Sequence, residues 1–257
     1  MRNKILMYFI GTAGSGKSTL THSYYEWCQL QGLDATLVNL DPGAEFLPYT
    51  PDVDIRDWIS LKDVMETYEL GPNGAQIACA DMIALNIEDI KASIDSFKAE
   101  YTLIDTPGQL ELFVFREAGK YTVEFLFPEQ SVLCYLLDPA LAKTPSGFVT
   151  QLLLSVTTNF RLQYPQINIL TKIDSLSEEE QNVIRQWSHD PESLYSAVIA
   201  EDASVYREMS EKIVQMLDQF GGYSELLFTS KKDHQGIDDV YNAVQQLFSG
   251  GEDTLKD

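Results

Sequence analysis

Cysteine, histidine and long apolar runs are all scarce in this chain. It has three cysteines in 257 residues, Cys28, Cys79 and Cys134, none in a C-x-x-C pair, which argues against a disulfide framework or a cysteine-based metal site. None of its three histidines has a partner at metal-ligand or triad spacing. No apolar run approaches the roughly 18 residues of a membrane span. We therefore expect a soluble cytoplasmic protein with no secretory leader and no membrane partner.

Basic residues are scarce as well. The chain has 18 Lys and Arg against 39 Asp and Glu, a formal net charge of −21 at pH 7. That charge repels a phosphate backbone, so we expect no direct contact with nucleic acid. We interpret the acidic surface as a solvated one, and a patch for a basic protein partner is the alternative.

Apolar runs typical of buried strands alternate with helical stretches. The strands are expected at residues 4–10, 35–39, 101–105, 131–137, 166–170 and 225–228. This alternation predicts an α/β fold with a doubly wound, mostly parallel sheet that helices cover on both faces. We expect a single domain over residues 1–249, with helical insertions at about 46–95 and 178–220, and a flexible tail at 250–257.

A glycine-rich loop follows the first strand. It reads Gly11-Thr12-Ala13-Gly14-Ser15-Gly16-Lys17-Ser18, which fits G-x-x-x-x-G-K-[ST], and a helix is expected just after it at residues 19–31. Between a strand and a helix, such a loop directs backbone N–H groups at phosphate oxygens. Lys17 would then neutralise the β- and γ-phosphates, and Ser18 would ligate Mg²⁺. The expected nucleotide contacts are Gly11, Ala13, Gly14, Ser15, Gly16, Lys17, Ser18 and Thr19.

Carboxylates follow the next two strands. Asp41 comes after the second strand, and Asp105 ends the third, within Asp105-Thr106-Pro107-Gly108-Gln109. Because the carboxyl ends of parallel strands meet at one edge, these residues are expected near the phosphate loop. Asp41 and Asp105 are therefore candidate Mg²⁺ ligands with Ser18. Gly108 is permissive enough to bring its N–H close to a γ-phosphate.

The last two strands lead into a candidate base-reading site. Thr171-Lys172-Ile173-Asp174 follows the fifth strand. A carboxylate at Asp174 can accept hydrogen bonds from guanine N1–H and its exocyclic amine, a donor pair that adenine lacks. Lys172 would pack on the base plane, and Ser230 and Lys231, after the last strand, would contact the base through backbone N–H groups.

In this order the motifs resemble the signature of GTPases, and two further segments resemble the GPN-loop GTPase family. These are Val38-Asn39-Leu40-Asp41-Pro42-Gly43-Ala44-Glu45 and Gly71-Pro72-Asn73, and residues 105–111 also match the family's extended D-T-P-G-Q-L-E form. The resemblance covers roughly residues 4–248. It implies the P-loop NTPase fold and a homodimer in which each Gly-Pro-Asn loop reaches the γ-phosphate of the partner. A tight helix–helix turn is the structural alternative for that tripeptide.

The resemblance also implies a reaction, the hydrolysis of GTP to GDP and phosphate with Mg²⁺. Lys17 would stabilise the transferred phosphoryl group, while Asp41, Gln109 and Glu111 are candidates to orient the attacking water. Asn73 of the second subunit would contact the γ-phosphate or that water.

Two positions depart from related families. Related dimerising ATPases carry a second lysine at the position of Thr12, so an ATPase of that type is disfavoured. Thr171 replaces an asparagine whose amide often braces the phosphate loop, so this amide is absent and a less rigid loop is expected.

Other functions stay open. One is a GTP-regulated scaffold or assembly factor that hydrolyses GTP slowly or not at all. Another is a P-loop kinase that uses ATP. Because eukaryotic relatives are associated with RNA polymerase assembly, resemblance makes such a complex a candidate client.

Overall fold

A computed structural model describes residues 4–126, 128–219 and 225–249. A seven-stranded sheet lies at its centre, in the order β3-β2-β4-β1-β5-β6-β7, and every described strand pair is parallel. The strands are β1 (Ile5–Gly11), β2 (Ala35–Asn39), β3 (Val53–Asp54), β4 (Tyr101–Asp105), β5 (Ser131–Leu137), β6 (Gln166–Leu170) and β7 (Leu226–Phe228). The predicted doubly wound parallel fold is confirmed. The expected tail at 250–257 and the last residue of the second expected insertion, residue 220, lie outside the described residues.

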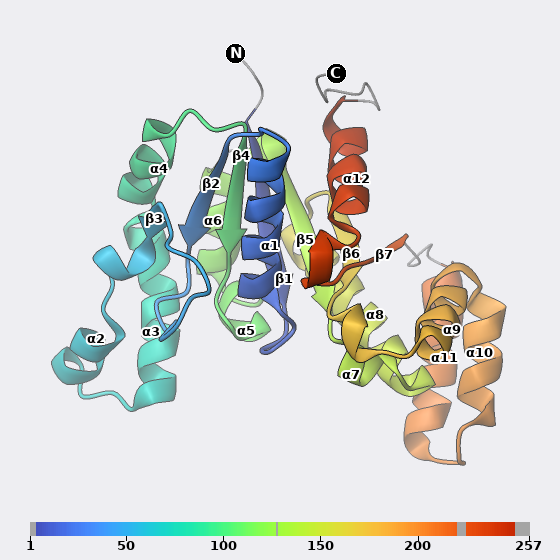
Figure 1. Ribbon diagram of the computed structural model, residues 1–257. Coiled ribbons are helices and arrows are strands. Elements are labelled where there is room, and N and C mark those ends of the chain that lie inside the picture. Colours follow the sequence, from blue (N-terminus) through green and yellow to red (C-terminus); the bar gives the residue numbers. More distant parts are fainter. Residues whose placement is uncertain (1–3, 127, 220–224, 250–257) are drawn as a thin grey trace.

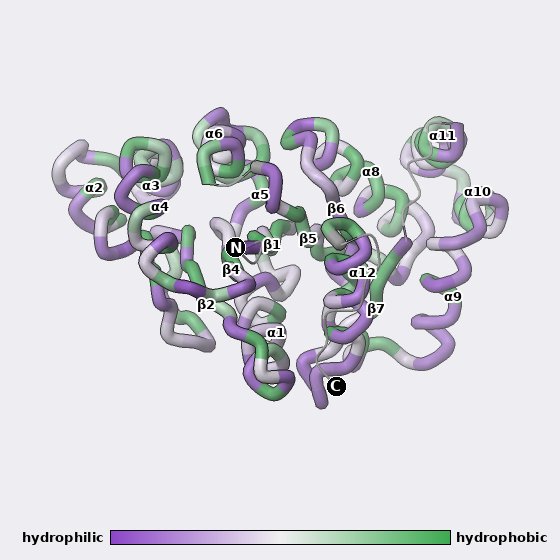
Figure 2. The backbone as a smooth tube through the Cα atoms, turned by 90° about the horizontal axis from the view of Figure 1, so that it is seen from above, coloured by the Kyte–Doolittle hydropathy of each residue, from purple (hydrophilic) through white to green (hydrophobic). Residues whose placement is uncertain are grey.

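Helices cover both faces of the sheet. The α-helices are α1 (Lys17–Leu30), α2 (Leu61–Thr67), α3 (Pro72–Leu85), α4 (Ile87–Ser96), α5 (Leu110–Phe113), α6 (Glu117–Phe125), α7 (Pro139–Ala142), α8 (Pro145–Leu162), α9 (Glu178–His189), α10 (Pro191–Ala200), α11 (Val205–Gln219) and α12 (Ile237–Ser249). Figures 1 and 2 show α1 and α12 on one face and α6 and α8 on the other. Helices α2–α4 flank the β3 end of the sheet, and α9–α11 flank the β7 end (Figure 1). Within the described residues, no helix is long and apolar enough to cross a membrane.

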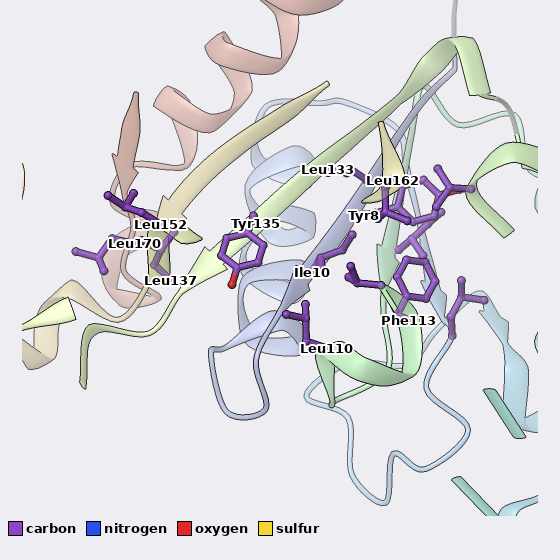
Figure 3. Close-up of a cluster of buried hydrophobic side chains, with 14 of the residues drawn as sticks. Tyr8, Ile10, Leu110, Phe113, Leu133, Tyr135, Leu137, Leu152, Leu162 and Leu170 are labelled. Carbon is purple, nitrogen blue, oxygen red and sulfur yellow. The ribbon is translucent and has the colours of Figure 1, made fainter. Parts of the chain in front are cut away.

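The central strands bury both of their faces. In β1, Leu6, Tyr8 and Ile10 belong to one apolar cluster, and the alternating residues Met7 and Phe9 belong to a second. This alternation follows from the two-residue period of a strand. In the first cluster, Phe113 of α5 stacks on Tyr8 with ring centroids 6.2 Å apart, and Leu110 lies beneath Ile10 (Figure 3). The sheet is therefore fixed from both sides, which holds the carboxyl ends of its strands in place.

The segment at 46–95 is only partly the helical insertion that the sequence predicts. It contains β3, whose Val53 and Asp54 pair in parallel with Val38 and Asn39 of β2. The backbone of Asp52 anchors this short strand, because its N–H donates to the Leu37 carbonyl at 2.8 Å. A two-residue strand is too short to show an alternating pattern, so sequence periodicity could not reveal it. Helices α2, α3 and α4 complete the segment.

The second insertion is helical, as predicted, over its described part. Ser177 and Glu180 form a capping box that begins α9, and Asp190 with Pro191 begins α10. The carboxylate of Glu201 accepts hydrogen bonds from the backbone N–H of Ser146, at 3.1 Å, and from its hydroxyl. These contacts fasten the insertion to the first turn of α8.

Candidate functional site

The phosphate loop joins β1 to α1 through two glycines with positive φ. Gly14 has φ 77° and Gly16 has φ 100°, a region that glycine enters without steric cost. Gly16 caps α1 without any side-chain hydrogen bond, and the first turn of α1 has no acidic residue. The first N–H groups of α1 therefore have no side-chain acceptor. Such a helix start favours an anion.

Lys17 is buried at the start of α1 and is surrounded by oxygen atoms. Its side-chain nitrogen donates to the carbonyls of Gly11 at 2.9 Å, Thr12 at 3.0 Å and Gly108 at 2.9 Å. Burial lowers the pKa of Lys17, and the carboxylates of Asp105 and Asp41 oppose that shift. The ammonium group thus sits between the phosphate loop and the loop after β4, where it can exchange carbonyl partners for phosphate oxygens.

Asp41 connects the loop after β2 with the loop after β4. Its two carboxylate oxygens accept hydrogen bonds from the N–H of Gly43 at 2.9 Å and of Gly108 at 3.0 Å. Burial raises the pKa of Asp41, whereas these bonds and the charges of Lys17 and Arg56 lower it. The Gly108 N–H, which the sequence assigns to a γ-phosphate, donates to Asp41 in this structure.

Asp105 ends β4 and is 1% exposed. The Tyr49 hydroxyl donates to its Oδ2 at 2.9 Å. Burial raises the pKa of Asp105 to about 6, although the hydroxyls of Ser18 and Tyr49 and the charge of Lys17 oppose the shift. Oδ1 has no hydrogen-bond partner of good geometry among the described residues. A buried carboxylate oxygen with spare capacity beside a serine hydroxyl fits the oxygen ligands that Mg²⁺ prefers.

A cavity of about 240 Å³ opens beside the phosphate loop. Its walls come from the loops after β6 and β7 and from α1, and the lining residues are Gly16, Thr19, Leu20, Ser23, Thr171, Lys172, Asp174, Ser175, Thr229, Ser230 and Lys231. The Ser230 hydroxyl donates to Oδ1 of Asp174 at 2.6 Å and fixes that carboxylate. The tertiary structure thus brings the predicted base-reading residues together with the phosphate loop.

Thr171 contacts the phosphate loop through its hydroxyl, although the amide of an asparagine is absent at this position. Its hydroxyl donates to the Ser15 carbonyl at 2.6 Å. The Lys172 side chain also donates to the Gly14 carbonyl. The Thr171 hydroxyl therefore braces the phosphate loop in place of the asparagine amide of other GTPases.

Three of the residues proposed to act on water or the γ-phosphate are exposed. Glu111 lies in the first turn of α5, and Asn73 in the first turn of α3. Gln109 extends to the side chain of Gln76 in α3, with Nε2 and Oε1 3.3 Å apart. The Gly-Pro-Asn tripeptide begins a helix, because Gly71 is its N-cap and Pro72 its first residue.

Two cations near the site are engaged in ion pairs. Arg56 contacts Asp54, with a shortest distance of 2.6 Å, and Arg116 contacts Asp81. Two further residues of the site, Tyr49 and Gln76, were not predicted from the sequence, because neither belongs to a recognisable motif and their contacts form only in the fold.

Known proteins match this chain over nearly its whole length. A family described as conserved hypothetical ATP binding proteins matches residues 9–250. GPN-loop GTPase 3 of Eremothecium gossypii is 31% identical over 97% of this chain and 94% of its own length. A GPN-loop GTPase of Pyrococcus abyssi is 33% identical over 92% of this chain and 94% of its own length. The solved apo structure of a Pyrococcus abyssi GTPase superimposes with a TM-score of 0.84 and 30% identity, covering 94% of this chain and 96% of that chain. With relatives matched from end to end and the predicted motifs gathered at one sheet edge, this chain belongs to the GPN-loop GTPase family.

Proposed function

We propose that this protein binds GTP with Mg²⁺ and hydrolyses it to GDP and phosphate. One observation carries the proposal: the phosphate loop adjoins a cavity in which the Asp174 carboxylate is held by Ser230. The triphosphate then lies on the amide-lined loop and the base lies against the carboxylate. Sites of this kind reject a base without the matching donors by up to about 10⁴–10⁵-fold.

The residues at the loop would bind and neutralise the phosphates. The backbone N–H groups of residues 14–19 and the Lys17 ammonium group approach from one side. Ser18 and Asp105 would hold Mg²⁺, with Asp41 as a further candidate, and the ion would supply positive charge to offset the charge of the phosphates. Phosphate oxygens would replace the three carbonyls that now accept from Lys17.

Among the candidates for positioning water, Asp41 has the strongest support within one chain. It is partly buried, its charge interacts with that of Lys17, and it accepts from the Gly108 N–H that a γ-phosphate would take. Once released from Gly108, its carboxylate could orient a water for in-line attack. Gln109 and Glu111 are exposed here, so each would act after a rearrangement or after a second subunit covers the site.

We also propose a homodimer in which Asn73 acts across the interface. Helix α3, which carries Asn73, packs against α5 and α6. Ile77 of α3, Phe115 before α6 and Tyr121 of α6 are 39%, 44% and 45% exposed. Exposed apolar side chains on α3, the helix that the tripeptide begins, and on and before α6, which packs against it, support an interface on this side of the molecule.

The proposed biological setting is the cytoplasm, with a protein client. From the family resemblance we propose assembly of a complex such as RNA polymerase. The net charge of −21 favours basic protein surfaces over nucleic acid as partners.

Isothermal titration calorimetry with Mg²⁺ and each of GTP, GDP and ATP tests the proposal. We expect guanine nucleotides to bind and ATP to bind far more weakly. If neither GDP nor GTP binds at millimolar concentration, the proposal is wrong. Tighter binding of ATP would instead favour the description of the matched family as ATP binding. Multiple-turnover phosphate release then separates a GTPase from a scaffold that hydrolyses GTP slowly or not at all.

A further inference from the structure

The loop at residues 40–52, between β2 and β3, is fastened to the end of β4 at two points. Near its start, Asp41 accepts from the Gly108 N–H. Near its end, the Tyr49 hydroxyl donates to Asp105. The guanidinium group of Arg56 holds the middle of the loop through the Ala44 carbonyl at 2.8 Å. The loop therefore contacts both Asp105, at the end of β4, and Gly108, in the loop that follows; both are expected near the phosphates.

Tyr49 is well placed to control the orientation of the Asp105 carboxylate. Its side chain is 9% exposed, and the ring of His22 in α1 stacks on it with centroids 6.2 Å apart. The ring is thus held in place, and its hydroxyl points at one carboxylate oxygen. With Oδ2 occupied, Oδ1 keeps its spare capacity in a buried setting.

We propose that Tyr49 is a positioning residue for the magnesium shell. Its hydroxyl fixes the rotation of the Asp105 carboxylate, so that the second oxygen stays available to an ion held with Ser18. Because Tyr49 belongs to the loop at 40–52, the same bond couples the position of that loop to the retention of Mg²⁺ and nucleotide. Partners that orient metal ligands typically contribute 10–100-fold to metal affinity. This inference rests on the proposed nucleotide site.

Release of a fluorescent GDP analogue at buffered Mg²⁺ concentrations tests the inference without hydrolysis. The variant Tyr49→Phe removes the hydroxyl and keeps the ring. The matched control is Tyr24→Phe, because the Tyr24 hydroxyl is also buried but has no hydrogen-bond partner among the described residues. We expect Tyr49→Phe to raise the Mg²⁺ concentration that half-maximally slows release by about 10–100-fold. With EDTA present, all three proteins should release the analogue at rates within about twofold, since the change concerns the ion.

A second pair of variants shows whether Tyr49 acts through Asp105. In the Asp105→Asn background the buried charge is absent, so adding Tyr49→Phe should leave the Mg²⁺ midpoint unchanged, as expected for two coupled residues. Additive effects would overturn the inference, as would a Tyr49→Phe midpoint equal to that of Tyr24→Phe. A Tyr49→Phe protein that releases the analogue faster than the wild type by the same factor with EDTA as with Mg²⁺ would overturn it too. If the wild type binds no GDP analogue, the proposed function itself fails. If the wild type responds to Mg²⁺ and Tyr49→Phe responds identically, only this inference fails.

Discussion

The Thr171 hydroxyl donates a 2.6 Å hydrogen bond to the carbonyl oxygen of Ser15, a residue 156 positions earlier in the chain. Both groups are buried. The bond ties the loop expected to read the base to the loop expected to hold the phosphates. Because it fixes the position of the phosphate loop, this bond should favour nucleotide binding, and its loss should weaken binding.

The substitution Thr171→Val keeps the side-chain shape and removes the donor. We expect it to lower GDP affinity about 5–30-fold, since a buried carbonyl left unsatisfied costs about 1–2 kcal/mol. Calorimetry at fixed Mg²⁺ measures this. The control is Thr158→Val, because the Thr158 hydroxyl is also buried and donates to the Leu154 carbonyl within α8 rather than to another loop. Equal GDP affinity in the two variants would show that the brace is unimportant.

Replacement of Asp174 by asparagine should change the preferred base. The amide introduced by Asp174→Asn can donate to the carbonyl of xanthine, so the ratio of GDP to XDP affinity should fall by about 10³-fold or more. Competition against a fluorescent guanine nucleotide measures this ratio. Asp138→Asn is the control, because Asp138 lies 3.9 Å from the Lys172 ammonium group and asparagine can replace it as the cap of α7. An ATP-dependent kinase should be indifferent to both variants.

Asp105 should make the ligand-free protein less stable as pH rises from 4 to 6. The pKa of Asp105 is about 6 in the folded protein against an ordinary value of 3.8. Between pH 4 and 6 the folded state therefore keeps a proton that the unfolded state has released. The free energy of unfolding therefore falls by about 3 kcal/mol over this range and does not recover above pH 6. Asp105→Asn should therefore increase the free energy of unfolding in urea at pH 7.5, by about 1–3 kcal/mol, and raise the Mg²⁺ concentration needed to slow nucleotide release.

Asp54 is a control for that experiment, because its pKa is shifted in the opposite direction to that of Asp105. Burial tends to raise its pKa, but hydrogen bonds from Arg56 and Asn39 lower it overall. Ionised Asp54 therefore adds stability above its unfolded pKa, and Asp54→Asn should destabilise the protein at pH 7.5. A destabilised Asp105→Asn would contradict the prediction for the buried carboxylate.

Mixed subunits can test whether Asn73 acts across a dimer. Asn73→Ala and Lys17→Ala should each abolish most GTP hydrolysis. In a mixed dimer, the intact Lys17 site would receive Asn73 from the Lys17→Ala subunit. Equal mixing should then restore about a quarter of the wild-type activity, since about half of the dimers are mixed and each has one complete site. Sedimentation must show that dimers persist, and the absence of any recovery in mixed dimers would contradict a role in trans.

The strands were predictable because they are long apolar runs in a sheet that is buried on both faces. Strands β2, β4, β5 and β6 have the predicted bounds, while β1 differs by one residue at each end and β7 by one residue at its start. Strand β3 was missed, because its two residues are specified by pairing with β2 and by the backbone of Asp52. Long-range pairing of this kind leaves no local pattern.

The residues that share the site were predictable only as a set. Lys17, Asp105 and Asp174 each follow a strand in a recognisable motif, so the sheet had to gather them at one edge. The side chains that contact these residues could not be predicted from the sequence. Tyr49 lies 56 residues from Asp105 in sequence, and its burial depends on how the loop at 40–52 folds over α1.

The order of strands and loops along the chain determined the fold and the edge where the phosphate loop lies. Motif spacing was enough for this, because a parallel sheet places all of its carboxyl ends together. Only the tertiary structure decided that the Gly108 N–H donates to Asp41, that Lys17 rests on three carbonyls, and that Thr171 replaces an amide as the brace. Each of these depends on angstrom-scale distances between loops, which packing of the whole sheet sets and which no local stretch of sequence encodes.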